Sequence, residues 1–171
     1  MEKCVAPISR ASQLPLAAIG WREWATLPQL GVQQIKAKVD TGARTSVLHA
    51  FDLQYFEASQ RLMVQFKTHP LQRNTSLVVE AIAPVLARRQ IRNSGGQTQE
   101  RPVILTPVSL GQQLWNIELT LTNRDMMDFR LLLGRTAICQ RFLVHPGDSY
   151  LMSQFSRSAA HADESNAAGL A

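Results

Sequence analysis

The chain is poor in cysteine and has no long apolar run. Its 171 residues include two cysteines, Cys4 and Cys139, which is too few for the disulfide framework of a small secreted protein. No apolar stretch approaches the roughly 20 residues that a membrane-spanning helix needs, and the N-terminal residues lack the apolar core of a secretory signal. These absences predict a soluble cytoplasmic protein that does not bind a membrane.

Motifs for metals and nucleotides are absent as well. The four histidines are scattered and form no His-Glu-x-x-His zinc motif, and no glycine-rich loop ends in the lysine that cradles ATP phosphates. We therefore expect no cofactor and no metal site. His49 is the one histidine near the loop described below, and a histidine beside the core is a better interpretation of it than a ligand or a proton-transfer partner.

Positive charge exceeds negative charge. Eighteen Lys and Arg against thirteen Asp and Glu give a net charge of +5 and a pI near 9.8, which favours an acidic partner such as nucleic acid, an anionic membrane or an acidic polypeptide. The arginine-rich segment 88–102 could contact phosphates, but a solvated hairpin face is the usual reason for such a run. We therefore do not expect nucleic-acid binding.

Short strands separated by turn residues run through most of the chain. In residues 35–39, apolar side chains alternate with lysines, which is the period of a half-buried strand. One short helix is expected after Gly134, and many short strands with one helix predict an all-β closed barrel. Paired strands are expected within 62–82, 88–105 and 108–121. The length predicts one domain, 19–155, with a lead-in, 1–18, and a disordered tail, 156–171.

The strand before residue 40 ends at Asp40-Thr41-Gly42-Ala43, and an apolar strand resumes at Val47. Asp and Gly are ordinary turn residues, so a bare Asp-Thr-Gly is a hairpin turn more often than a catalytic loop. The extension to Ala43 and the apolar strand on each side instead indicate a carboxylate held in a fixed position. We interpret Asp40 as the reactive group of the chain.

Two elements resemble the retropepsin-like aspartic proteases: the loop 40–43, and the apolar strand 131–135 that ends in Gly-Arg and packs beneath that loop in the family. The resemblance covers about residues 19–151. It is greatest to a bacterial family labelled ATP-dependent zinc proteases, although the chain has neither the zinc nor the ATP motif. The resemblance implies a retropepsin-like (acid protease) barrel and an aspartic peptidase, a hydrolase, whose catalytic residues are Asp40, Thr41 and Gly42.

The same resemblance implies substrate contacts from Ala43 and from the flap hairpin, at Gly95 and Gly96. Arg44 stands where viral retropepsins carry a second aspartate, and we expect it to face the same region as Arg135. Two cations need an acidic group between them, either from elsewhere in the protein or from the substrate. With the positive net charge, our hypothesis is a preference for an acidic, glutamate-rich peptide or protein substrate. The family's association with enzymes that add glutamates to a ribosomal protein implies a functional link to a glutamate ligase.

One carboxylate cannot serve as both acid and base in this reaction. A single Asp-Thr-Gly per chain therefore predicts a homodimer in which Asp40 and its symmetry mate share a proton at the two-fold axis. Two other functions stay open. One is a non-catalytic β-barrel that binds an acidic peptide or RNA, and the other is the metal-dependent hydrolase that the family label names.

Overall fold

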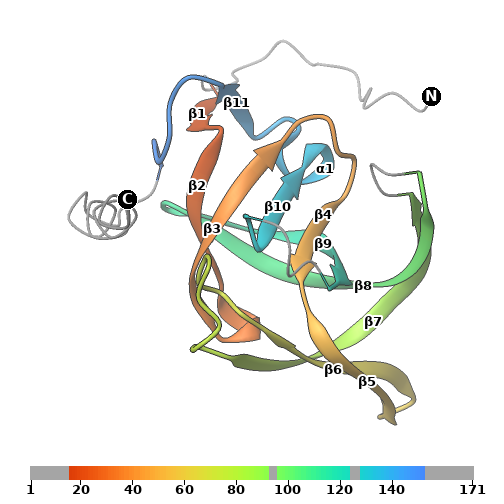
Figure 1. Cartoon of the computed structure of the whole chain (residues 1–171). Coiled ribbons are helices and arrows are strands. Elements are labelled where there is room, and N and C mark those ends of the chain that lie inside the picture. Colours follow the sequence, from red (N-terminus) through yellow and green to blue (C-terminus); the bar gives the residue numbers. More distant parts are fainter. Residues whose placement is uncertain (1–15, 93–95, 124–127, 153–171) are drawn as a thin grey trace.

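A computed structural model describes residues 16–92, 96–123 and 128–152 (Figure 1). The predicted tail, and the lead-in up to residue 15, lie outside the described residues. Within these residues the chain forms eleven strands, one short α-helix and one 3-10 helix. The elements are β1 (Ala17–Gly20), β2 (Arg22–Leu27), η1 (Pro28–Leu30), β3 (Val32–Asp40), β4 (Ser46–His49), β5 (Phe51–Ala58), β6 (Arg61–Thr68), β7 (Val79–Arg92), β8 (Thr98–Leu110), β9 (Gln113–Thr122), β10 (Leu131–Gly134), α1 (Arg135–Ile138) and β11 (Phe142–His145).

Six strands close into a barrel in the order β2-β3-β10-β4-β9-β8. The barrel closes because β2 also pairs with β8, where Thr26 lies opposite Ser109. Closure pairs strands that would otherwise present free edges. The prediction of an all-β closed barrel with one short helix is confirmed.

Alternating side chains divide each barrel strand into an inner and an outer face. Ala37 and Val39 of β3 belong to the core, as do Leu131 and Leu133 of β10. Successive side chains of a strand point to opposite faces, so Leu132, between the two core leucines, lies on the outer face. The core is therefore filled from one face, and the opposite face of these strands is left for a site.

Three strands, β7, β6 and β5, extend the sheet beyond the barrel in this order, starting from the barrel strand β8. β7 and β8 form a long antiparallel arm that is paired out to Arg92 and Thr98, and Figure 1 shows this arm curving away from the barrel. The pairs β6–β7, β7–β8 and β8–β9 confirm the three predicted hairpins. A further antiparallel pair, β5–β6, precedes them in the chain.

The two ends of the described chain are joined beside the barrel. β1 pairs in parallel with β11, and the fully buried carboxylate of Glu23 accepts hydrogen bonds from the backbone N–H groups of Gly20, Leu151 and Met152. Buried carboxylates need such donors because an unpaired buried charge is costly. Glu23 thus ties the segment after β11 to β2.

Candidate active site

Two parallel strands bring the predicted catalytic loop and the Gly-Arg element to the same edge of the sheet. β3 and β10 pair in parallel, so both end at this edge, and Asp40 lies opposite Gly134. β4 pairs antiparallel with β10 on its other side. Residues 41–45 therefore pass around the end of β10, with the strand that precedes them and the strand that follows them held by the same neighbour.

The Asp40 carboxylate is fixed by its own loop. Its Oδ1 atom accepts hydrogen bonds from the backbone N–H groups of Gly42, at 3.0 Å, and Ala43, at 3.1 Å. The side chain is half-buried, whereas Thr41 and Gly42 are exposed. The loop thus orients one carboxylate oxygen and presents the turn at the surface.

The first residues of helix α1 hold the loop 41–45 by hydrogen bonds to its backbone carbonyls. The backbone N–H of Arg135 donates to the Ala43 carbonyl at 2.8 Å, and Thr136 donates to the Arg44 carbonyl through both its N–H and its hydroxyl. The Arg135 guanidinium donates from Nη1 to the carbonyls of Thr41 and Gly42, each at 3.3 Å. Arg135 therefore contacts the loop backbone.

Close approach explains the glycine that precedes α1. A Cβ atom on Gly134 would lie 2.5 Å from the Thr45 carbonyl carbon and 2.9 Å from the Arg44 carbonyl oxygen. The Gly134 N–H donates to the Ser46 hydroxyl at 3.0 Å, a buried contact. The loop and β10 are packed backbone to backbone here, so the loop has little freedom to shift.

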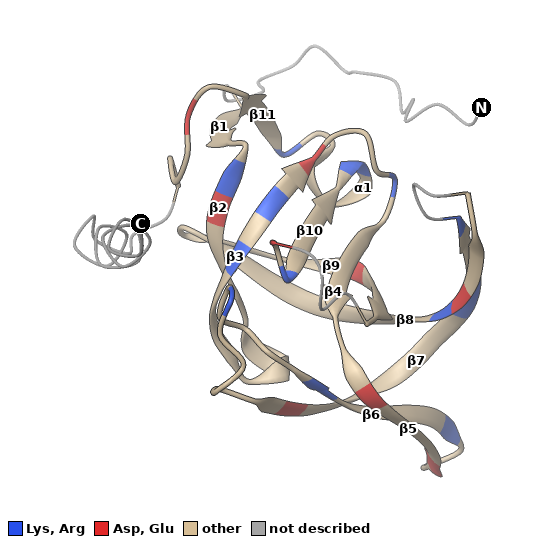
Figure 2. Cartoon of the chain, in the orientation of Figure 1, with Lys and Arg blue, Asp and Glu red and all other residues tan. Residues whose placement is uncertain are grey.

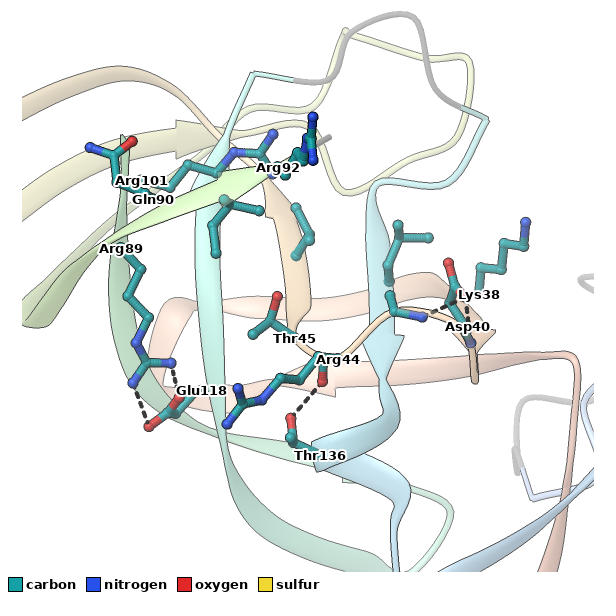
Figure 3. A pocket seen from close by; sticks show the side chains of 15 residues that line it. Lys38, Asp40, Arg44, Thr45, Arg89, Gln90, Arg92, Arg101, Glu118 and Thr136 are labelled. Atoms are coloured by element: carbon teal, nitrogen blue, oxygen red, sulfur yellow. Dashed lines mark hydrogen bonds and ion pairs between the residues drawn. The ribbon is translucent and has the colours of Figure 1, made fainter. Parts of the chain in front are cut away.

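A cleft of about 1120 Å³ opens beside the loop. It spans the outer face of β3, β10, β4, β9, β8 and β7, and Figure 3 shows Arg92 and Arg101 across the cleft from Asp40. Its lining residues are Lys38, Asp40, Gly42, Ala43, Arg44, Thr45, Val47, Arg89, Gln90, Ile91, Arg92, Arg101, Glu118, Leu132 and Thr136.

Basic side chains outnumber acidic ones in the cleft. Figure 2 shows blue segments on β3 and on the β7–β8 arm, on the two sides of β10 and β4. Like charges gathered on a concave surface attract ligands of opposite charge. The basic lining residues are Lys38, Arg44, Arg89, Arg92 and Arg101, and the acidic ones are Asp40 and Glu118.

Glu118 neutralises part of this charge. Both terminal nitrogens of Arg89 donate to the Glu118 carboxylate, with Nη2 to Oε1 at 3.2 Å. This hydrogen bonding lowers the pKa of Glu118 and raises the pKa of Arg89, and the charge of Arg44 lowers the pKa of Glu118 further. The acidic group expected between Arg44 and Arg135 lies instead near Arg44 and Arg89.

The structure brings most of the predicted site residues together. Asp40, Gly42, Ala43 and Arg44 line the cleft, whereas Arg135 is not among the described residues that do so. Gly96 lies at the exposed end of the β7–β8 arm with φ +82°, and Gly95 is outside the described residues. The catalytic and substrate-binding roles of all these residues, and of Thr41, remain predictions.

The charged cleft residues that the sequence analysis did not assign to the site include Arg89, Arg92, Arg101 and Glu118, and it interpreted the arginine-rich segment 88–102 as a solvated hairpin face. Arg89 and Arg101 lie opposite each other in the β7–β8 ladder, and Glu118 reaches them from β9. For Glu118 the available signal was its position between Ile117 and Leu119, which are core residues. The sequence does not give the register between strands, which is what places these side chains in one cleft.

His49 is far from solvent and belongs to an aromatic group. It is fully buried, its Nε2 lies 3.3 Å from Nδ1 of His69, and both rings stack with Phe51. In the described part of the chain, no group of three or more His, Cys, Asp and Glu is placed to hold a metal ion. No described helix is long and apolar enough to span a membrane.

The family model of the RimB-like retropepsin-like aspartic endopeptidases matches residues 18–154. The chain belongs to this RimB-like family. The retropepsin-like barrel implied by the resemblance is thereby confirmed. A solved structure of a protein of unknown function from Legionella pneumophila resembles this RimB-like chain with a TM-score of 0.69 and 28% identity, over 80% of this chain and 98% of that one.

Curated relatives of the RimB-like chain carry a different name. A "Probable alpha-L-glutamate ligase" from Parasynechococcus marenigrum is 48% identical over 77% of this chain, and proteins of the same name from Desulfotalea psychrophila and Shewanella halifaxensis are 43% identical over 82% and 80%. The chain spans only 28% to 30% of the length of these relatives. The zinc protease label is not carried by any of these names.

Proposed function

We propose that the chain is an aspartic endopeptidase that works as a homodimer on acidic, glutamate-rich peptides. The observation that carries this proposal is the fixed carboxylate of Asp40 in the lining of a basic cleft. In this proposal Asp40 of each protomer supplies one half of the acid–base pair that activates water. The family membership supports the reaction class.

The exposed turn supports the dimer. Thr41 and Gly42 are exposed and follow directly after Asp40, so a second copy can approach the carboxylate from the side of the turn. A two-fold axis through this turn brings the two Asp40 side chains together by the same contact on both protomers. Two nearby carboxylates then share one proton and titrate as a pair.

The charge of the cleft supports an acidic substrate. Lys38 and the four cleft arginines exceed the available carboxylates, since Glu118 is engaged with Arg89 and Arg44. A glutamate side chain entering this cleft meets guanidinium groups that form charge-assisted hydrogen bonds with carboxylates. Neutral peptides lack that gain.

The names of the relatives support a link to glutamate chemistry. Proteins named glutamate ligases contain a segment similar to this chain that makes up under a third of their length. A ligase that adds glutamates and a peptidase that removes them act on the same acidic chain in opposite directions. The proposed partner of this protein is therefore the glutamate-bearing product of a glutamate ligase.

The test is cleavage of a glutamate-rich peptide by the wild type and by Asp40→Asn. The substitution keeps the size of the side chain and the Oδ1 acceptor, and removes the charged carboxylate. We expect wild-type cleavage and no cleavage by the variant, with equal binding of peptide to both. Cleavage that survives in Asp40→Asn contradicts the aspartic mechanism, and sensitivity to a chelator supports the metal-dependent alternative instead.

A second candidate function is a non-catalytic module that holds an acidic chain. The similarity to a segment of proteins named glutamate ligases favours it, because such a segment can present the acidic product to another active site. In this case purified wild-type protein binds glutamate-rich peptide and leaves it intact, and Asp40→Asn behaves identically.

A further inference from the structure

Arg101 is a buried cation in the wall of the cleft. It is 7% exposed, yet it lines the cleft and is drawn there on the side opposite Asp40 (Figure 3). Burial lowers the pKa of its guanidinium, because a charged group loses favourable hydration when it leaves water. A buried arginine is normally paired with a carboxylate.

No carboxylate pairs with Arg101 among the described residues. Its Nε donates at 3.2 Å to a neutral acceptor, Oε1 of Gln99. The same Gln99 oxygen accepts from the Thr122 hydroxyl, also at 3.2 Å. These contacts fix the Nε side of the guanidinium and leave its two terminal nitrogens, Nη1 and Nη2, without an acceptor among the described residues. The pair of nitrogens that can bind a carboxylate is therefore oriented and unused.

The other cleft arginines differ from Arg101. Arg89 donates to Glu118, and Arg44 is close enough to Glu118 to lower its pKa. Arg92 donates to the Gly96 carbonyl and is exposed. Arg101 therefore combines burial, an oriented guanidinium and the lack of an acidic partner within the described part of the chain, and it also lies opposite another arginine, Arg89, in the ladder.

We propose that Arg101 determines specificity by binding the side-chain carboxylate of an acidic substrate residue in the cleft. This inference rests on the proposed function for the nature of the ligand. An incoming glutamate carboxylate supplies two oxygens in the geometry that the two terminal guanidinium nitrogens match. Because Arg101 has already lost part of its hydration on folding, the contact costs less desolvation on the protein side than a contact to an exposed arginine.

Binding is measured in the Asp40→Asn background, so that no peptide is cleaved. The ligands are a glutamate-rich peptide and a glutamine-rich peptide of equal length, and the variants are Arg101→Gln and Arg101→Lys. Arg61→Gln is the matched control, because Arg61 is exposed on β6 and outside the cleft and its loss changes net charge equally. Thermal unfolding of each variant accompanies the titrations.

We expect Arg101→Gln to weaken binding of the glutamate peptide by about 10- to 100-fold, the loss for one hydrogen-bonded charged contact. The glutamine peptide is expected to bind equally weakly to all variants, Arg61→Gln to change little, and Arg101→Lys to recover only part of the affinity because lysine lacks the fork. An equal loss on both peptides, or wild-type binding without preference for glutamate, overturns the proposal.

The thermal data separate a binding role from a structural one. Arg101 is a buried cation with no acidic partner among residues 16–92, 96–123 and 128–152, so its removal is expected to leave the melting temperature unchanged or raise it. A large decrease in both Arg101 variants shows that Arg101 holds the wall together, and overturns the proposal. If glutamate preference depends on Arg101 but the wild type cleaves neither peptide, the inference stands and the peptidase function fails. Tighter binding of a phosphopeptide than of the glutamate peptide overturns the choice of carboxylate.

Discussion

Gly134 lies directly opposite Asp40 in the parallel ladder of β10 and β3. The residue opposite the proposed catalytic carboxylate is thus one without a side chain, and the backbone of the loop occupies the space that a Cβ would need. The position of the carboxylate depends on a contact between two backbones. This makes the Gly-Arg element a part of the site, although Gly134 itself is buried.

Gly134→Ala is expected to displace the loop. The new Cβ would lie 2.5 Å from the Thr45 carbonyl carbon, and a forced backbone shift of this kind costs typically about 1–3 kcal/mol. Urea denaturation measures the loss of stability, and peptide cleavage is expected to fall with it. Gly147→Ala is the control, since its Cβ would meet only the end of the His145 side chain, at 3.3 Å. Equal stability of the two variants contradicts the packing argument.

Glu23→Ala is expected to release the segment after β11. The substitution leaves the N–H groups of Gly20, Leu151 and Met152 without their acceptor, and each unsatisfied buried donor costs about 1–3 kcal/mol. Differential scanning calorimetry is expected to show a marked decrease in the melting temperature. Glu57→Ala, on the exposed part of β5, removes the same charge and is expected to change little. If both variants melt alike, the Glu23 contacts do not stabilise the fold.

Glu118→Gln is expected to change the pH dependence of stability. The pKa of Glu118 is lower in the folded protein than its ordinary value of 4.5 because of the Arg89 hydrogen bond. The ion pair therefore stabilises the wild type above about pH 4.5, and the gain is lost as the pH falls through the lowered pKa. Both side chains are more than a third exposed, so the gain at pH 7 is only about 0.2–1 kcal/mol.

Chemical denaturation of the wild type and Glu118→Gln at pH 7 and at pH 3 checks this dependence. The wild type is expected to be more stable at pH 7, with a smaller difference at pH 3. A difference that persists undiminished at low pH means that the carboxyl contributes by packing. The same variant also frees the cations that Glu118 engages, Arg44 and Arg89, so its affinity for a glutamate-rich peptide is expected to rise several-fold.

The sequence predicts the central elements well because their signals are local. The strand that ends at Asp40 and the apolar strand that ends at Gly134 each show their own pattern, and the structure places them side by side. The position of the cleft arginines on β7 and β8 was not predictable in this way. Arg101 lies opposite Arg89 because of the register between β7 and β8. The sequence carries no signal for which residues of two strands lie opposite each other.

The direction of the Arg135 side chain could not be predicted from the sequence either. The sequence places it one residue after Gly134, which correctly predicts a position next to the loop. Its direction depends on how α1 begins, and α1 turns the guanidinium toward the carbonyls of Thr41 and Gly42. Arg44 lines the cleft and Arg135 is not among the described lining residues, so the expectation that both act on the same acidic group remains a prediction.

Mixing protomers tests whether both copies of Asp40 are needed. In the proposed homodimer each active site contains one Asp40 from each chain, so a dimer of wild type and Asp40→Asn has no complete pair. When equal amounts are mixed and allowed to exchange, each of the two protomers of a dimer is wild type in about half of the cases. Random pairing therefore leaves about a quarter of the dimers as pure wild type.

Cleavage per total protein is therefore expected to fall to about a quarter of the wild-type value, and not to the half expected if each chain acts alone. Dilution of the wild type is expected to lower activity per protomer as the dimer dissociates, and sedimentation over the same concentrations reports the dimer directly. An activity of one half after exchange, with a monomer in sedimentation, rules out the shared pair of carboxylates. In that case the second acid must come from within the chain, and Glu118 is the other carboxylate that lines the cleft among the described residues.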